Sequence, residues 1–202
     1  DLSNRVEELK DSPTAITAFC FLAAGILLKL AAFPLHGWIP NAYAYAPSSV
    51  SALFAGTATK IALYLLIRII HTVFGIEFAL GILPFDELII LLGLCGVFAG
   101  SIKAIFEDNL KRMFAYSSVA QVGYLMIGVG LLSASGLTAT LVHVFNHALM
   151  KSAVFLALGA VIYRTGLVSI KDIAGLGTRM PLTMATIVIA GFSLIGLPAT
   201  SG

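Results

Sequence analysis

Residues 141–161 read LVHVFNHALMKSAVFLALGAV, and this stretch decides the fold class. A transmembrane helix needs about 20 mostly apolar residues, so the stretch is long enough to cross a bilayer. Within it stand His143, His147 and Lys151, spaced four apart. Ionisable side chains are costly inside a membrane and usually face the bundle interior or a wet cavity. The stretch therefore predicts a membrane helix that carries a polar stripe on a protein-facing side.

The composition of the whole chain agrees with a membrane protein. Of its 202 residues, 59% are hydrophobic and 11% are charged, and the mean hydropathy is +1.00; soluble domains carry about 25% charged residues. The formal net charge of +2 gives no indication of nucleic-acid binding. Cys20 and Cys95 stand in apolar runs, so we interpret them as small hydrophobes rather than a disulfide or metal site. The chain begins at Asp1 and stops after an apolar run, so we expect it to be a piece of a larger membrane protein.

Six segments of the chain have the length and apolar character of membrane spans, or nearly so. They lack the period-2 alternation of barrel strands and are longer than such strands. Backbone polar groups must be satisfied internally in lipid, so the remaining solution is a bundle of helices. We therefore predict an all-α, polytopic membrane protein. The six segments are 14–34, 49–70, 86–106, 112–132, 137–162 and 181–197.

The basic residues in the connections predict the orientation of the bundle. Arg5, Lys10 and Arg68 stand on the side where the chain begins, and the opposite side has twice as many basic residues. Cytoplasmic loops carry the excess of Lys and Arg in membrane proteins. We therefore expect this second side to face the cytoplasm of a cell membrane, and Asp1 to face outward. The residues of the second side are Lys103, Lys111, Arg112, Arg164, Lys171 and Arg179.

Two spans are expected to be broken helices. Pro34, Gly37, Pro40 and Pro47 follow the first span in a stretch without charged residues. This pattern predicts a helix that is interrupted at membrane depth and continues as a short second piece. Residues 191–202, GFSLIGLPATSG, end the last span in a similar way. Paired helices interrupted by Gly and Pro are typical of inverted-repeat transporters, although both residues are also frequent in ordinary membrane helices.

Three lysines stand inside predicted spans: Lys29, Lys60 and Lys151. A lysine at the bilayer centre costs about 2.5–3.5 kcal/mol on insertion scales and is a functional candidate by default. All ten acidic residues lie outside the spans or at their edges, so no carboxylate in these spans can pair with the lysines. Either the partners lie elsewhere, or the lysines are often neutral, and both situations suit a lysine that exchanges protons. Basic residues near helix ends are expected to reach water instead: Lys103, Lys111 and Arg112.

The polar residues of 141–161 form one slanted stripe. A spacing of four advances about 40° around an α-helix and rises about 6 Å, so the stripe extends over about 12 Å. Asn146 lies beside it. Histidine titrates near neutral pH, so His143, His147 and Lys151 are suited to passing protons through intervening water. We predict a proton-translocation route over these residues together with Lys29 and Lys60.

Other readings of the polar residues remain open. His143 and His147 have the i, i+4 spacing of zinc-binding histidines, but Val144 stands where a zinc protease has its glutamate, and no Cys or acidic ligand is near. We therefore expect no metal and no other cofactor. The stripe could also make dry contacts in a subunit that only scaffolds its partners. Further residues could line the water path or make interhelical hydrogen bonds: His36, Ser117, Ser118, Gln121, Tyr124 and Asn146.

Three long motifs resemble a known family. They are KLAAFPLHGWIPNAYAYAPSSVSALFAGTATKIALYLLIR at 29–68, DNLKRMFAYSSVAQVGYLMIG at 108–128 and HVFNHALMKSAVFLALGAV at 143–161. They are similar to the antiporter-like membrane subunits shared by Mrp-type sodium/proton antiporters, respiratory complex I and membrane-bound hydrogenases. The resemblance covers nearly the whole chain after about residue 14.

The resemblance implies a fold and a set of working residues. Members have about fourteen transmembrane helices arranged as inverted repeats, and residues 1–202 resemble the seventh helix through the early twelfth. The family's central lysine matches Lys29, and its bridging lysine matches Lys60. The ionisable positions of the eleventh helix match His143, His147 and Lys151. The glutamate that pairs with the central lysine, and the charged residue of the twelfth helix, fall outside this sequence.

The resemblance also implies a function. PNAYAYAPS, GTATK and FNHALMKSAVFLALGAVIYRTG look most like the D-type membrane protein of Mrp-type antiporters. A proton-translocating subunit of a sodium/proton antiporter complex is therefore expected, with other membrane subunits as partners and no redox chemistry of its own. The alternative is a proton-pumping membrane subunit of complex I or of a membrane-bound hydrogenase.

Overall fold

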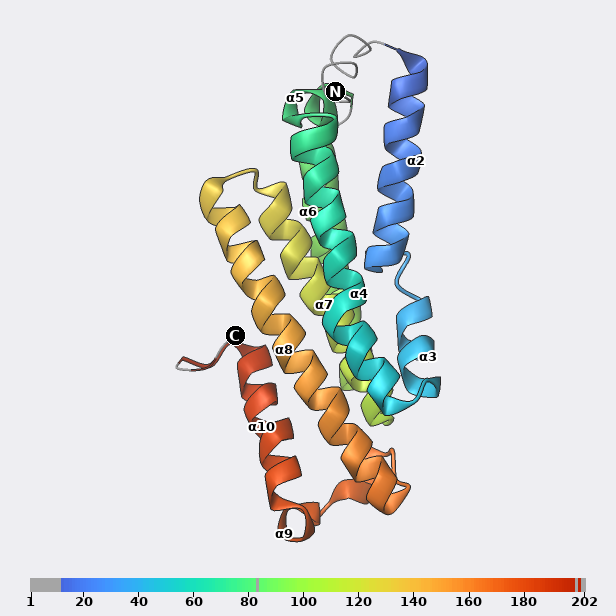
Figure 1. Cartoon of the computed structure of the whole chain (residues 1–202), viewed down its shortest axis with the longest axis vertical. Coiled ribbons are helices and arrows are strands. Elements are labelled where there is room, and N and C mark those ends of the chain that lie inside the picture. The colour runs from blue at the N-terminus through green and yellow to red at the C-terminus, as the bar shows by residue number, and fades with distance from the viewer. Residues whose placement is uncertain (1–11, 83, 199, 201–202) are drawn as a thin grey trace.

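The chain folds into a bundle of α-helices that run roughly along one common axis (Figure 1). The computed structural model describes residues 12–82, 84–198 and 200, and it contains no β-strand within these ranges. The predicted all-α class is therefore confirmed. In order, the elements are α2 (Pro13–Leu30), α3 (Trp38–Tyr45), α4 (Ser48–Arg68), the π-helical η1 (Ile69–Val73), α5 (Ile76–Ile82), α6 (Phe85–Ile105), α7 (Leu110–Gly130), α8 (Ala134–Thr165), the 3-10 helix η2 (Ile170–Ile173), α9 (Leu176–Arg179) and α10 (Pro181–Ile195).

Five helices in the described part of the chain are long and apolar enough to cross a membrane: α2, α4 with η1, α6, α7 and α8. They coincide with the first five predicted spans. The sixth predicted span forms α10, which is apolar but has only 15 residues. At a rise of 1.5 Å per residue, α10 reaches about 22 Å and falls short of a hydrocarbon core about 30 Å thick.

Local sequence signals explain where the long helices begin and end. Pro13 occupies the first turn of α2, where its missing N–H is not needed. The side chains of Asn109 and Ser133 accept hydrogen bonds from Arg112 N and Gly136 N and thereby cap α7 and α8. Gly166 ends α8 with a φ of 71°, a conformation that glycine adopts without strain.

The first predicted break is present, but it begins earlier than the sequence suggested. The first span was expected to reach residue 34, whereas α2 ends at Leu30 and Ala31 is left-handed with a φ of 61°. Pro34 offers no N–H to the carbonyl of Leu30, so the helix closes before it. The indole of Trp38 then donates to Leu28 O at 3.0 Å, which ties the short α3 to the end of α2.

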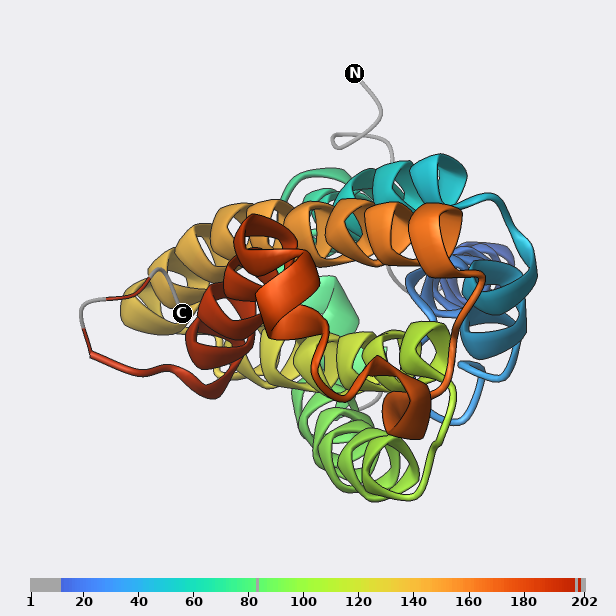
Figure 2. The same cartoon turned by 90° about the horizontal axis from the view of Figure 1, so that it is seen from below.

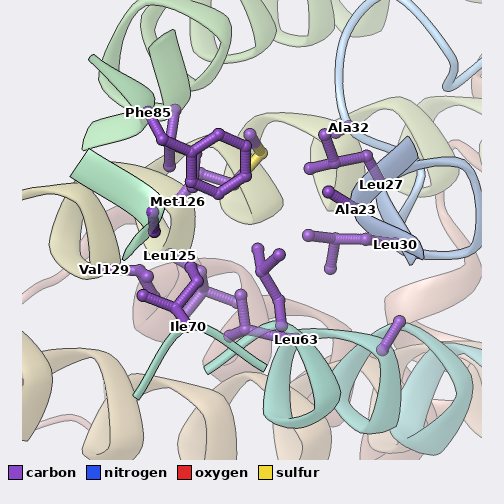
Figure 3. Close-up of a cluster of buried hydrophobic side chains, with 14 of the residues drawn as sticks. Ala23, Leu27, Leu30, Ala32, Leu63, Ile70, Phe85, Leu125, Met126 and Val129 are labelled. Atoms are coloured by element: carbon purple, nitrogen blue, oxygen red, sulfur yellow. The ribbon is translucent and has the colours of Figure 1, made fainter. Parts of the chain in front are cut away.

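A large apolar cluster lies where α2, α4, α6 and α7 meet (Figure 3). Phe19 is at its α2 end, in edge-on contact with the rings of Phe74, Phe78 and Phe85 at centroid distances of 5.1 to 5.8 Å. Edge-to-face aromatic pairs add to the free energy gained by burial. This cluster holds α4 and α7 in place, and Val144 of α8 also packs against it.

Helix α8 carries the polar stripe and is in contact with three other helices. It packs against α4, α7 and α10, as the view along the bundle shows (Figure 2). It has 32 residues and extends from Ala134 to Thr165, beyond both ends of the predicted 137–162 span. The polar stripe seen in the sequence therefore lies at the middle of the bundle.

The basic connections meet at one end of the bundle, as the span order requires. Asn109 and Ser169 pair in an isolated antiparallel bridge, and Lys171 Nζ lies 3.6 Å from Asp108 Oδ2. Arg5 and Lys10, assigned to the opposite end, lie outside the described residues. One expectation at the basic end is wrong. Lys111 does not reach water but is only 6% exposed, because its ammonium group donates to Ala46 O, at the end of α3, at 2.8 Å.

Candidate functional site

The polar stripe of α8 faces protein. His147 and Lys151 are fully buried, and His143 is half-buried. The imidazole rings of His143 and His147 stack with centroids 5.8 Å apart and an interplanar angle of 9°. The helical spacing thus brings the two histidines into direct contact, with Lys151 one turn further along.

Lys151 reaches across to α7. Its ammonium group donates to Phe114 O at 2.8 Å and to the hydroxyl of Ser117, and it lies 5.6 Å from the centroid of the Phe114 ring. A lysine ammonium has three donors and no acceptor. The Phe114 carbonyl, the Ser117 hydroxyl and the Phe114 ring therefore stabilise the charged form of Lys151. No carboxylate of the described residues takes part.

Lys60 approaches the same region from α4. Its side chain is 7% exposed, and its ammonium group donates to Ala55 O on its own helix. The charge of Lys60 lies within electrostatic range of His143, His147 and Lys151. We call Lys60, His143, His147 and Lys151 the Lys/His cluster.

The Lys/His cluster has no carboxylate partner in the described part of the chain. The ion pairs found there, Arg112 with Glu107 at 3.2 Å and Lys171 with Asp108 at 3.6 Å, stand at the basic end of the bundle. The surroundings of the cluster are instead helix carbonyls, hydroxyls and one amide. Such groups can stabilise a protonated lysine or histidine without taking up its proton. A proton can therefore bind to the cluster and leave it again.

The amide of Gln121 connects the cluster to α10. Gln121 is 8% exposed; its Oε1 lies 2.6 Å from His143 Nε2, and its Nε2 donates to Leu194 O at 3.2 Å. His147 differs from His143, because neither of its ring nitrogens has a hydrogen-bond partner among the described residues. The two histidines of the stripe therefore have different surroundings.

Of the other residues that the sequence nominated, three lie outside the cluster and two, Ser118 and Asn146, lie next to it. Lys29 is exposed in the last turn of α2, and Tyr124 is 52% exposed on α7. His36 stacks on Phe33 at a centroid distance of 5.5 Å, in the segment between α2 and α3. Ser118 is buried, and its hydroxyl donates to Phe114 O on its own helix. Asn146 is half-buried beside the stripe on α8.

The backbone contributes groups to the site that the sequence did not identify. The carbonyls of Ala55 and Phe114 accept hydrogen bonds from Lys60 and Lys151. Every residue type carries such a carbonyl, so the sequence does not mark these two. No group of three or more His, Cys, Asp or Glu side chains suited to a metal ion occurs among the described residues. Cys20 and Cys95 are free thiols.

Comparison with known proteins shows the family. The profile described as NADH:quinone oxidoreductase/Mrp antiporter, TM, matches residues 1–202. NADH-quinone oxidoreductase subunit N of Desulforudis audaxviator is 43% identical over 202 residues, which are 100% of this chain and 40% of that protein. F(420)H(2) dehydrogenase subunit L of Methanosarcina mazei is 38% identical over 197 residues, which are 93% of this chain and 28% of that protein.

Two solved structures have the same fold. A chain of the Mrp complex from Dietzia sp. superposes with a TM-score of 0.85 at 30% identity, over 93% of this chain and 34% of that chain. A chain of the membrane-bound sulfane sulfur reductase, an archaeal respiratory membrane complex, gives a TM-score of 0.86 at 30% identity, over 98% of this chain and 40% of that chain. The chain thus spans 40% or less of the length of each of these relatives. The resemblance inferred from the three motifs is confirmed, and the chain belongs to the NADH:quinone oxidoreductase/Mrp antiporter transmembrane family.

Proposed function

We propose that this chain is part of a proton-translocating membrane subunit and that the Lys/His cluster carries the proton. The observation behind the proposal is the meeting of four ionisable side chains, from α4 and α8, inside membrane-spanning helices without a carboxylate partner among the described residues. Ionisable residues at this depth mark ion pathways and proton relays in membrane proteins.

Electrostatic coupling gives the cluster a way to move a proton. Two positive charges close together in a medium of low dielectric repel each other strongly, so a proton that arrives on Lys60 disfavours a proton on Lys151. Lys151 has acceptors on α7 for its charged form, and Lys60 has one on α4. A proton can therefore rest at either lysine and be driven from one toward the other.

His147 supports a hydrated link within the cluster. Its imidazole is fully buried, yet no described residue bonds to it. Buried polar groups are normally hydrogen-bonded, and those without a protein partner are sites for bound water. A water chain at His147 would link the two lysines.

Lys29 is proposed as a further station on the route, on the strength of the family resemblance. It stands in the last turn of α2, directly before the break at Ala31. Broken helices lie near the transport site in inverted-repeat transporters. The route would pass from Lys29 through Lys60 to His143, His147 and Lys151.

The identities favour a redox-linked complex as the setting. The two sequence relatives described above are subunits of an NADH-quinone oxidoreductase and of an F(420)H(2) dehydrogenase, at 43% and 38% identity. We therefore propose a membrane subunit that moves protons while partner subunits carry out the redox chemistry. The sodium/proton antiporter suggested by the motifs is the second candidate, supported by the superposition on the Mrp chain.

The test is proton transport by the full-length protein in its complex, reconstituted in vesicles. Lys60→Ala removes a buried station, so we expect at least a tenfold loss of proton translocation with normal assembly. Lys171→Ala, at an exposed lysine of the basic end, is the matched control and should leave transport unchanged. Full transport by Lys60→Ala would contradict the proposal. Transport that requires a sodium gradient, rather than an electron donor, would favour the antiporter.

A further inference from the structure

The end of α10 leaves the carbonyl of Leu194 without a helical donor. The helix closes at Ile195, and Gly196 takes a φ of 81°. The N–H groups of Gly196 and Leu197 bond to Ser193 O and Phe192 O, so Leu194 O is one of the last-turn carbonyls that a helix leaves unpaired. The Gln121 amide on α7 supplies a donor instead, at 3.2 Å.

This contact fixes the orientation of the amide. A glutamine side chain has one end that only donates and one end that only accepts. With Nε2 directed at the Leu194 carbonyl, Oε1 is directed at His143 Nε2, 2.6 Å away. The reversed amide would place two acceptors, Oε1 and Leu194 O, against each other.

The orientation of the amide determines where His143 carries its hydrogen. Because Oε1 only accepts, the nitrogen facing it must donate, and neutral imidazole has a single N–H. We propose that Gln121 is a positioning residue that holds neutral His143 as the Nε2–H tautomer, so that a proton in transit binds and leaves at Nδ1. This inference deepens the proposed function and rests on it for the statement that His143 binds and releases a proton in transit. The tautomer itself follows from the hydrogen bonds alone.

The arrangement also tolerates protonation of His143. Imidazolium donates from both nitrogens, so the bond to Gln121 is kept and becomes charge-assisted. The neighbouring charges come from Lys60 on α4 and, when it is protonated, from His147 on α8, and they act on His143 through space rather than through the amide. Gln121 can therefore remain in place while Nδ1 gains and loses its proton.

The test is nitrogen-15 NMR of histidine-labelled full-length protein in its complex, in lipid. The pH is set high enough that the imidazoles are neutral, and His143→Gln identifies the His143 signals by their loss. We expect wild-type His143 as Nε2–H alone, with the strongly deshielded proton of a short hydrogen bond. Gln121→Met should remove the deshielding and populate both tautomers.

One more variant separates this inference from a general disturbance of packing. Thr140→Val, in which a buried hydroxyl bonded to Gly136 O is lost, should leave the His143 signals as in wild type. An Nδ1–H signal in wild type, or an unchanged spectrum in Gln121→Met, would overturn the proposal. These readings need no transport, so they stand apart from the outcome for Lys60→Ala.

Discussion

At the scale of single residues, Ser117 is the side chain whose hydroxyl stabilises the charged form of Lys151. Its hydroxyl accepts from Lys151 Nζ, and hydrogen bonds to charged groups contribute about 1.5–3 kcal/mol. Ser117→Ala should therefore make the charged form of Lys151 less stable and slow proton translocation by roughly tenfold or more, since about 1.4 kcal/mol corresponds to a factor of ten. Proton uptake by vesicles that contain the assembled complex measures the change.

The neighbouring serine is a matched comparison for this prediction. Ser118 has the same chemistry but makes no hydrogen bond to Lys151: its hydroxyl donates to Phe114 O, the carbonyl that Lys151 also uses, at 3.0 Å. The sequence nominated both serines as lining a water path, whereas the geometry assigns a contact with Lys151 to Ser117. Equal losses of transport in Ser117→Ala and Ser118→Ala would contradict the distinction made here.

The sequence could predict the ionisable members of the site but not what surrounds them. The spacing of four in His143, His147 and Lys151 placed them on one side of a helix, which only requires helical geometry. The acceptors of Lys60 and Lys151 are backbone carbonyls, and no pattern of side chains marks which carbonyl a distant lysine will meet.

At the scale of helices, the contact between α6 and α7 depends on glycine. A Cβ on Gly123 would lie 2.5 Å from Gly93 O and 2.8 Å from Val97 N, and backbone atoms cannot turn aside as a side chain can. Gly123→Ala should push the helices apart and destabilise the protein by about 1–3 kcal/mol, as overpacking does. The melting temperature of the purified full-length protein measures this. Gly25→Ala, whose Cβ would meet nothing within 4 Å in the described part of the chain, should leave it unchanged.

The helices themselves could be predicted from the sequence, and their ends less well. Apolar runs of about 20 residues predicted all five long helices, since lipid leaves no other structure for such runs. The early end of α2 was missed because Ala31, not a glycine, takes the left-handed conformation. The short elements η1 and α5 were missed as well, since they occupy a connection that carries no periodic signal.

At the scale of the whole molecule, the sequence alone could not show which helices meet. Lys151 and Phe114 are 37 residues apart, and Gln121 and Leu194 are 73 apart, so these contacts depend on how the bundle packs. The first candidate on the route, Lys29, stays exposed on α2 while the other four gather between α4 and α8. Its assignment therefore depends on the family resemblance, and that of the others also on the fold.

The bundle brings its basic connections to one end, and this arrangement makes its orientation in the membrane testable. Lys171 lies in η2, just after α8 at that end, whereas Ser135 lies in the first turn of α8 at the opposite end. The positive-inside rule predicts that Lys171 faces the cytoplasm and Ser135 faces outward. Cys20 and Cys95 are the free thiols of the chain, so the background variant replaces both with alanine.

Single cysteines at these two positions then report the sidedness of the full-length protein. Lys171→Cys should react with a membrane-impermeant maleimide in inverted vesicles but not in right-side-out vesicles, and Ser135→Cys should show the reverse. Solubilised protein, in which both positions must react, controls for accessibility. Labelling of Lys171→Cys in right-side-out vesicles would show that the bundle has the opposite orientation in the membrane. The end formed by Asn109 and Ser169 would then face outward.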